Sequence, residues 1–441
     1  MANMKELANS MKKLEDQLLV CVKCGACQAV CPVYSVTRKE ADVARGKFAL
    51  FEGLIDNMFE DPDGVKKRLD HCLLCGSCAD SCPSNVNAVE IFIRTRSILA
   101  EYKGLSLPNK IILRKLLSNP DFFNKIVGWA QKFQRMFVKP EKNTQATSCA
   151  RLGTPFFKDR HIKIASSSFF HKLSDLDTGK NNTGPVVLFF TGCLIDKILV
   201  DIAISSVKAM VYHNFKVLLI EKQGCCGIPA LSAGDNKSFQ KLITYHKDLF
   251  NNYEFDYLVT SCATCTSVIK KLWISLYEDK DDVSYFKLID ISNKTLDISQ
   301  LLINVAKAND ANINNIDFKK EYIKKVAYHD PCHLKKALGI FKEPRQLLKA
   351  AGAELVEIED SDKCCGMGGS FNLKYYNISS EIGNIKAKNI MDTKCGLATT
   401  SCPACILQIS DMLAKQKAKI KIKHPIQLYA QSLKGDLKIE S

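Results

Sequence analysis

No run of about 18 uncharged apolar residues, the length that a membrane-spanning helix needs, occurs in this sequence of 441 residues. The N-terminal stretch MANMKELANSMKKLEDQLL mixes charged and apolar residues and lacks the apolar core of a signal peptide. Fingerprints of flavin, nicotinamide and phosphate-loop sites are also missing, and no G-x-G-x-x-G follows an expected strand. We therefore expect a cytoplasmic chain with no place for a hydride, whose membrane association, if any, comes through a complex.

Positive charge is in excess, but it is locally concentrated. The net charge is +15, and the stretch from Lys103 to Lys142 alone carries nine lysines and arginines against two acids, Asp121 and Glu141. The rest of the chain shows no such local concentration of positive charge, and no recognised nucleic-acid motif is present. We therefore expect no nucleic-acid partner.

Cysteine is abundant, with 20 residues in the chain. Packing alone does not require so many. Because a long chain without an export signal resides where thiols stay reduced, metal binding explains these cysteines better than disulfides do.

Two copies of one cysteine motif lie near the N-terminus. CVKCGACQAVCP begins at Cys21 and CLLCGSCADSCP at Cys72, both with the spacing C-x2-C-x2-C-x3-C-P and a constant offset of 51 residues. Three thiolates at this spacing can hold three corners of a cubane [4Fe-4S] cluster, and in the two-cluster arrangement the fourth cysteine of each copy serves the other cluster. The predicted ligand sets are Cys21, Cys24, Cys27 and Cys82 for one cluster, and Cys72, Cys75, Cys78 and Cys31 for the other.

A zinc ribbon is the alternative for these motifs, but it would leave the third C-x2-C step and the Cys-Pro pairs unexplained. Gly25 and Gly76 are expected to let the backbone approach the clusters, and Pro32 and Pro83 to turn the chain away. Between the motifs, ADVARGKFALFEGLI has a helical pattern. We expect this helix to pack over the clusters and exclude water.

A second duplication follows Pro185, where apolar strand patterns alternate with helical ones. Each cysteine group comes directly after an expected strand and before an expected helix, so an open parallel sheet would gather the thiols at the carboxyl ends of its strands. Corresponding cysteines are 139 or 140 residues apart. The two predicted ligand groups are Cys193, Cys225, Cys226, Cys262 and Cys265, and Cys332, Cys364, Cys365, Cys402 and Cys405.

The repeated Cys-x31-Cys-Cys-Gly pattern, followed by Cys-x2-Cys, resembles the cysteine-rich CCG domain. That family includes heterodisulfide reductase subunits, lactate-utilisation proteins and the iron-sulfur subunits of glycolate oxidase and anaerobic glycerol-3-phosphate dehydrogenase. The order of one two-cluster domain and two CCG domains looks most like the glycolate oxidase subunit. The resemblance implies a noncubane [4Fe-4S] cluster at one or both CCG sites, with zinc in place of one cluster in some relatives. If one site holds zinc, we expect it to be the first, because the second has the richer surroundings HDPCH and CCGMGGSF.

Two histidines flank the first cysteine of the second repeat. His329 and His333 could donate a proton to a substrate or to a cluster-bound thiolate, or they could hydrogen-bond backbone near a buried cluster, and we favour the second interpretation. Gly366, Gly368 and Gly369 are expected to form tight turns. Cys149 and Cys395 have no predicted role.

The segment from Leu107 to Pro140 combines apolar residues at helical spacing with interleaved lysines and arginines. It could lie on an anionic membrane surface, but we favour a pair of helices packed on the protein itself or on a partner subunit. The stretch from Asn143 to Gly184 is predicted to be a loop-like linker.

The predicted fold is therefore a helical ferredoxin-type domain with two [4Fe-4S] clusters, followed by two duplicated α/β CCG domains. The expected bounds are residues 1–102, a basic helical segment and linker at 103–184, and CCG domains at 185–310 and 311–441. By resemblance, the chain relays electrons from a partner FAD subunit, which oxidises glycolate or D-lactate, to a quinone, cytochrome or other acceptor subunit. The alternative is a heterodisulfide reductase-like subunit that reduces a disulfide at a CCG-bound cluster. A glycerol 3-phosphate enzyme is a third, lesser option.

Overall fold

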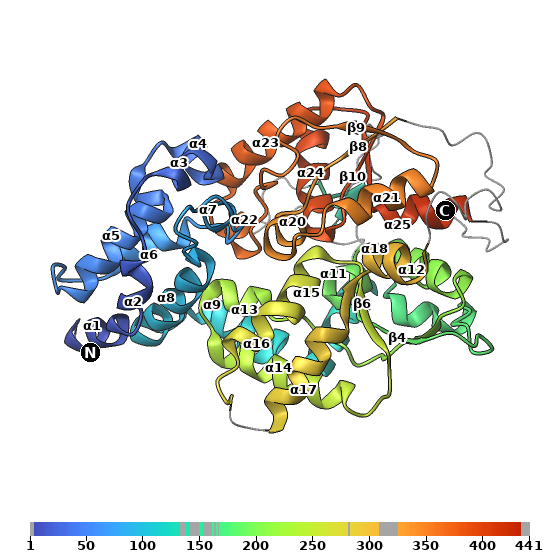
Figure 1. Ribbon diagram of the computed structural model, residues 1–441, viewed down its shortest axis with the longest axis horizontal. Coiled ribbons are helices and arrows are strands. Elements are labelled where there is room, and N and C mark those ends of the chain that lie inside the picture. The colour runs from blue at the N-terminus through green and yellow to red at the C-terminus, as the bar shows by residue number, and fades with distance from the viewer. Residues whose placement is uncertain are drawn as a thin grey trace.

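A computed structural model of the chain describes residues 4–132, 138–140, 150–152, 161–162, 165, 167–280, 283–307 and 325–433. Figure 1 shows three lobes: α1 to α8 in blue at the left, the green and yellow elements from β4 onward below, and the orange and red elements from β8 onward above. The first lobe is helical in its described residues. Its elements are α1 (Met4–Lys12), α2 (Glu15–Leu19), α3 (Ala26–Val30), α4 (Pro32–Thr37), η1 (Glu40–Asp42), α5 (Ala44–Ile55), α6 (Asp63–Asp70), α7 (Ser77–Asp80) and α8 (Ala88–Lys103).

The core of the helical lobe forms between α5 and α8. Phe48 and Phe51, three residues apart on α5, are buried and pack against Phe92 of α8, with ring centroids 5.6 and 6.1 Å from it. Spacings of three and four residues put side chains on one face of a helix, which is why this apolar stripe turns inward. The helix predicted between the two cysteine motifs is therefore present, and the same face borders both motifs.

The second and third lobes each contain a four-stranded parallel sheet. The first sheet has the order β5-β4-β6-β7 and the second β9-β8-β10-β11, so the two have the same topology. The elements of the first are β4 (Val186–Phe189), α11 (Gly192–Lys197), α12 (Val200–Tyr212), β5 (Lys216–Leu218), α13 (Ile228–Ala233), α14 (Asn236–Phe250), β6 (Tyr257–Thr260), α15 (Ala263–Ser267), η5 (Val268–Leu272), α16 (Trp273–Leu276), α17 (Val283–Lys294), β7 (Thr295–Asp297), α18 (Ile298–Gln300) and η6 (Leu301–Val305).

The second sheet lobe repeats this order more briefly. Its elements are β8 (Lys325–Tyr328), α20 (Cys332–Leu338), α21 (Lys342–Ala350), β9 (Glu354–Glu357), α22 (Ser370–Lys374), α23 (Tyr376–Asp392), β10 (Leu397–Thr399), α24 (Pro403–Lys415), β11 (Lys421–Lys423) and α25 (Pro425–Ser432). The predicted fold class, a helical N-terminal domain followed by duplicated α/β domains, is confirmed.

Strand register explains why the cysteines converge. In the first sheet Leu188 of β4 lies opposite Leu218 of β5 and Leu258 of β6. All four residues of β4 are apolar and three of them are buried, as expected for a strand of a parallel sheet that is covered on both faces. The three strands run parallel and in register, and their carboxyl ends therefore open at one edge. The cysteine groups follow that edge in both sheets.

The segment between the lobes is only partly described. It contains α9 (Leu107–Lys110), the π-helical η2 (Ile111–Leu117), α10 (Pro120–Lys132), an antiparallel sheet of β1 (Val138–Pro140), β2 (Ala150–Leu152) and β3 (His161–Ile162), and η4 (Phe169–Asp175). The stretch predicted as a linker thus includes short strands and a helical turn. Sequence reasoning missed them because strands of two or three residues show no measurable periodicity.

The helices of the basic segment pack partly on the protein itself. Arg114 of η2 forms an ion pair with Asp235 at 3.2 Å, and the amide of Asn124 on α10 donates to the carbonyl of Gln223. The side chains of Ile112 and Trp129 nevertheless remain largely exposed. Among the described residues, no helix is both long enough and apolar enough to cross a membrane.

Candidate metal centres

The first ferredoxin-type cavity lies between the two motifs. It is lined by Cys21, Cys24 and Cys27 of the first copy and by Cys82 of the second. Cys24 is exposed, so this cavity is the one closer to solvent. The structure thus brings together the four thiols that were predicted to share a cluster.

The second cavity shows the reciprocal arrangement. Cys72, Cys75 and Cys78 line it together with Cys31, the last cysteine of the first copy. Burial raises the pKa of Cys31 to about 11, and the nearby Cys75 and Cys72 thiols act in the same direction. Cys78 borders both cavities, so the two ligand sets adjoin.

Both motif loops use the same backbone conformation. Lys23 and Leu74, the residues before the second cysteine of each copy, have φ of 55° and 53°. Gly25 and Gly76, the residues after it, have φ of 86° and 75° and begin the short helices α3 and α7. Left-handed conformations on both sides of a cysteine curl the loop around its thiol, and glycine adopts this conformation at little cost. The close approach of these glycines to a cluster stays a prediction.

A buried cation faces the second cavity. Lys47 of α5 is 1% exposed, lines the cavity, and donates through Nζ to the carbonyl oxygen of Asp42. Burial lowers the pKa of Lys47, whereas thiolates at Cys72 and Cys31 oppose that shift. Sequence reasoning missed this residue, although a lysine within the apolar helical stripe that contains Ala44 and Phe51 was a usable signal.

The five thiols of the first sheet lobe form one continuous group. The Cys225 thiol raises the pKa of Cys193, while its hydrogen bond lowers the pKa of Cys226 to about 6. Cys226 in turn hydrogen-bonds Cys265, whose backbone amide donates to the Cys262 sulfur at 3.5 Å. Gly192, at φ 64°, lies so close that a β-carbon there would be 3.0 Å from the Cys265 sulfur.

The second sheet lobe repeats this group. Cys364 raises the pKa of Cys332 and lowers that of Cys365. The Cys365 and Cys405 sulfurs are 3.2 Å apart, and Cys405 also hydrogen-bonds Cys402. All five are buried. Thiols at equivalent places in the two repeats are therefore connected in the same order.

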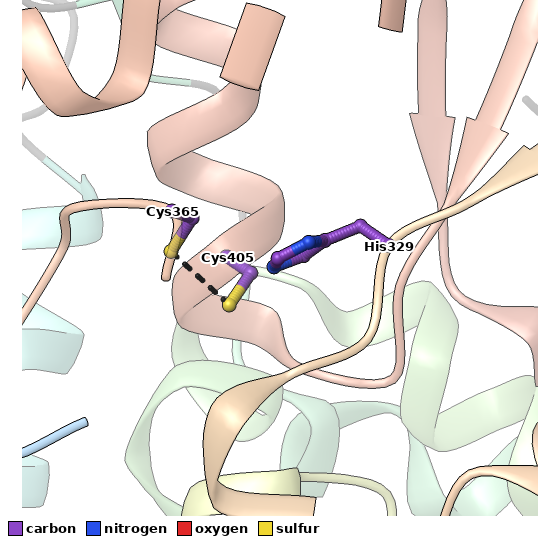
Figure 2. A group of neighbouring side chains, drawn as sticks. All are labelled: His329, Cys365 and Cys405. Atoms are coloured by element: carbon purple, nitrogen blue, oxygen red, sulfur yellow. Dashed lines mark hydrogen bonds between the residues drawn. The ribbon is translucent and has the colours of Figure 1, made fainter. Parts of the chain in front are cut away.

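The two flanking histidines lie differently. The His329 Nδ1 atom is 2.8 Å from the Ser361 carbonyl oxygen, which is the kind of backbone hydrogen bond we favoured. His333 also hydrogen-bonds backbone, at Leu74 of the helical lobe, and its Nδ1 atom lies 3.0 Å from the Thr264 hydroxyl of the first sheet lobe. Figure 2 shows that the His329 ring points toward Cys365 and Cys405.

The ligand sets of different lobes also touch. The Cys364 thiol hydrogen-bonds Cys75 and raises the pKa of Cys75 well above its usual range. A hydrogen bond from Cys262 lowers the pKa of Cys402 well below its usual range. The four ligand sets therefore adjoin in a linear order. The set of the first ferredoxin-type cavity comes first, followed by those of the second cavity, the second sheet lobe and the first sheet lobe.

These donor sets fit iron-sulfur clusters. All 19 cysteines in the described residues are free thiols, and soft thiolate groups of four or five are the ligands that such clusters take. Cys395 is buried in the apolar core, where its thiol lies 3.7 Å from the Thr393 carbonyl oxygen, and Cys149 lies outside the described residues. The number and type of clusters, and the assignment of each ligand, stay predictions.

Comparisons with known proteins match the same regions. The model of the cysteine-rich CCG domain matches residues 187–270 and 326–410, and that of the 4Fe-4S dicluster domain matches residues 17–86. The chain is 26% identical over 426 residues to the probable glycolate oxidase iron-sulfur subunit of Bacillus subtilis (strain 168), covering 92% of each chain.

Two further relatives cover different extents of the chain. A subunit of the dihydromethanophenazine:CoB–CoM heterodisulfide reductase of Methanosarcina barkeri is 23% identical over 440 residues, which is 95% of this chain and 94% of the relative. Lactate utilization protein A 2 of Bacillus cereus (strain AH820) is 28% identical over 250 residues, which is 56% of this chain and 98% of that protein. The chain therefore contains one 4Fe-4S dicluster domain followed by two cysteine-rich CCG domains.

Proposed function

We propose that the chain is the iron-sulfur subunit of a flavin-dependent 2-hydroxy acid dehydrogenase acting on glycolate or D-lactate. The observation that carries the proposal is the linear contact of the four ligand sets, which begins at the exposed Cys24 and ends at Cys193. Bound iron-sulfur clusters would supply one-electron carriers at these places. The names of the glycolate oxidase and lactate utilization relatives point to the substrate class.

The chain's own residues hold and shield the ligand sets. Cys225, Cys226, Cys364 and Cys365 are each at most 4% exposed, so their sites are closed to water. Lys47 places a positive charge beside the second ferredoxin-type cavity, where it would stabilise added negative charge. These residues therefore bind thiolate-held groups, exclude solvent and set the local charge.

Substrate oxidation is assigned to a partner. Because the sequence carries no flavin or nicotinamide fingerprint, a separate FAD subunit would take the hydride equivalent from the hydroxy acid. The two electrons would leave through a quinone, a cytochrome or another acceptor subunit. The partner and the acceptor are both part of the proposal.

A disulfide reductase is the second candidate, and one observation favours it. The thiol sets of the two sheet lobes meet at Cys262 and Cys402, and His333 lies beside this junction. The full-length similarity to a heterodisulfide reductase subunit agrees with this candidate. In this candidate function, a disulfide substrate would be reduced to two thiols at the junction of the two thiol sets.

Anaerobic purification with any associated subunits tests the two candidates. Iron, zinc and flavin are quantified per complex, and the visible absorption of the clusters is followed after adding glycolate, D-lactate or a disulfide. About 16 iron atoms per chain would indicate four clusters, and about 12 with one zinc the mixed case. A complex that lacks flavin in every chain, or whose clusters do not bleach with either hydroxy acid, would contradict the main proposal.

A further inference from the structure

The two sheet lobes differ at one buried position beside their thiol groups. His329 directly follows β8 as Phe190 directly follows β4, with the same 139-residue offset as the cysteines. The backbones also match, since the His329 amide donates to Thr399 and the Phe190 amide to Val259, at 2.9 and 2.8 Å. The second repeat thus has an imidazole where the first has a phenyl ring.

The hydrogen bond of His329 determines its tautomer. A backbone carbonyl can only accept, so Nδ1, 2.8 Å from the Ser361 oxygen, carries the proton. The lone pair of the neutral ring is then on Nε2. That atom is buried and has no hydrogen-bond partner within the described part of the chain. An unsatisfied buried acceptor is unfavourable and calls for a missing partner.

The free nitrogen is aimed at thiols. His329 Nε2 and the sulfurs of Cys365 and Cys405 all lie within 4.8 Å of one another, and Figure 2 shows the ring edge directed at both cysteines. A metal bound at about 2.0 Å from nitrogen and about 2.3 Å from sulfur can be shared by three atoms this close. The grouping has the geometry of a ligand set rather than of a packing contact.

Among its described residues, the first repeat has a phenylalanine at the position of this nitrogen. Phe190 packs its ring on His246, with centroids 5.4 Å apart. His246 uses both of its nitrogens on backbone: Nδ1 lies 2.8 Å from the Leu242 oxygen and Nε2 accepts from the Gly224 amide at 3.1 Å. The described surroundings of the first thiol group therefore provide sulfur ligands alone.

We propose that His329 Nε2 is a metal ligand at the second CCG site, together with Cys365 and Cys405. The second site is then a mixed imidazole-thiolate centre, and the first is a thiolate centre. This inference rests on the metal loading in the proposed function. Imidazole ligands raise the reduction potential of iron-sulfur centres, so the second site would hold an electron more readily than the first.

Isotope labelling of the whole complex tests this ligand. The protein is labelled with 15N-histidine, purified anaerobically, reduced with dithionite and measured by electron-nuclear double resonance. X-ray absorption at the zinc and iron K-edges is measured in parallel. We expect strong coupling to one histidine nitrogen on a reduced cluster, or one nitrogen neighbour at the zinc edge if that site holds zinc. If both signals are absent from the wild-type protein, the proposal is wrong. This measurement does not depend on the folding of any variant.

Two variants locate the nitrogen. His329→Phe copies the first repeat and is expected to abolish the signal and, for an iron centre, to lower one midpoint potential by at least 59 mV, a tenfold change for one electron. His246→Phe is the control and should leave both unchanged. Loss of the signal in the control instead would overturn the assignment. Since dithionite replaces the hydroxy acid, failure of substrate bleaching would contradict the proposed function and leave this result standing.

Discussion

The Thr264 hydroxyl oxygen lies 3.6 Å from the sulfur of Cys402, across the boundary between the two sheet lobes. Thr264 belongs to α15, the helix that also carries Cys265 of the first thiol group. The Ala263 amide supports the junction by donating to the Ser401 carbonyl oxygen at 3.0 Å. One short helix therefore connects two predicted metal sites.

Replacing Thr264 with valine should lower the reduction potential of one CCG centre. Hydrogen bonds to ligand sulfur raise the potential, and valine has the same shape without the hydroxyl. We expect a shift of no more than about 59 mV, a tenfold change in the one-electron equilibrium. Potentiometric titration followed by electron paramagnetic resonance measures it. Thr266→Val is the control, because the Thr266 hydroxyl donates to the Cys262 carbonyl oxygen at 3.0 Å rather than to a sulfur; an equal shift there would contradict the prediction.

Replacing Lys47 with methionine should lower the potential of the cubane in the cavity that Lys47 lines. The buried ammonium stabilises the more negative reduced state, so its loss disfavours reduction by about 59 mV or more. Lys47→Arg keeps the charge and should retain most of the potential. Arg45→Met is the matched control at the other cavity; Arg45 is more exposed and pairs with Glu40 at 2.7 Å, so a smaller shift is expected.

Replacing Arg96 with methionine should destabilise the contact between the helical lobe and the first sheet lobe. Arg96 is 6% exposed and donates to the carbonyl oxygens of Ser232, Leu69 and Cys72 at 2.8, 3.0 and 2.7 Å. Three buried carbonyls would lose their donor, which costs on the order of 3 kcal/mol. Urea denaturation under anaerobic conditions measures the loss.

The control for Arg96 lies on the same helix. Arg94 pairs with Glu90 at 2.7 Å on the exposed face, and such pairs contribute about 0–1 kcal/mol. Arg94→Met should therefore change the free energy of unfolding by at most about 1 kcal/mol. If the two substitutions lower the free energy of unfolding equally, the buried hydrogen bonds of Arg96 contribute no more to stability than the exposed ion pair of Arg94.

The sequence predicts which cysteines lie near one another because each group is encoded locally. Fixed spacing identifies Cys21 to Cys31 and Cys72 to Cys82, and a repeated offset of 139 or 140 residues identifies the two CCG groups. Contacts between groups depend on how whole lobes dock, which no local pattern specifies. The approach of Cys75 to Cys364 and the free nitrogen of His329 therefore appear only in three dimensions.

Acid should weaken the contact between the two sheet lobes through His213. Its Nε2 lies 2.7 Å from the Tyr429 hydroxyl on α25, the Tyr212 ring packs on its edge, and burial lowers the pKa of His213 to about 4. In the unfolded chain the pKa of a histidine is about 6.5, so between pH 6.5 and pH 4 the unfolded chain binds more protons than the folded protein does. Stability is therefore complete above about pH 6.5 and falls as the pH drops toward 4, by on the order of 2–3 kcal/mol.

His213→Gln cannot titrate and should make this part of the pH profile less steep, while the buried His246 and His424, whose pKa values burial also lowers to about 4, keep their contributions. Urea denaturation midpoints at several pH values between 4 and 7 provide the comparison. His171→Gln, at an exposed histidine, is the control and should keep the wild-type slope. A wild-type slope in the His213 variant would show that the acid sensitivity arises elsewhere.

Pairs of cysteine substitutions should separate the crossed ligand assignment from a sequential one. In the crossed arrangement Cys31→Ala removes the same cubane as Cys72→Ala, whereas Cys82→Ala removes the same cubane as Cys21→Ala. In a sequential arrangement Cys31 would instead group with Cys21. The cavities favour crossing, because Cys31 borders the cavity of Cys72 and Cys82 borders that of Cys21. Each variant should lose about four iron atoms and one of the paramagnetic signals of the reduced protein. If Cys31→Ala loses the same signal as Cys21→Ala, the crossed assignment is wrong.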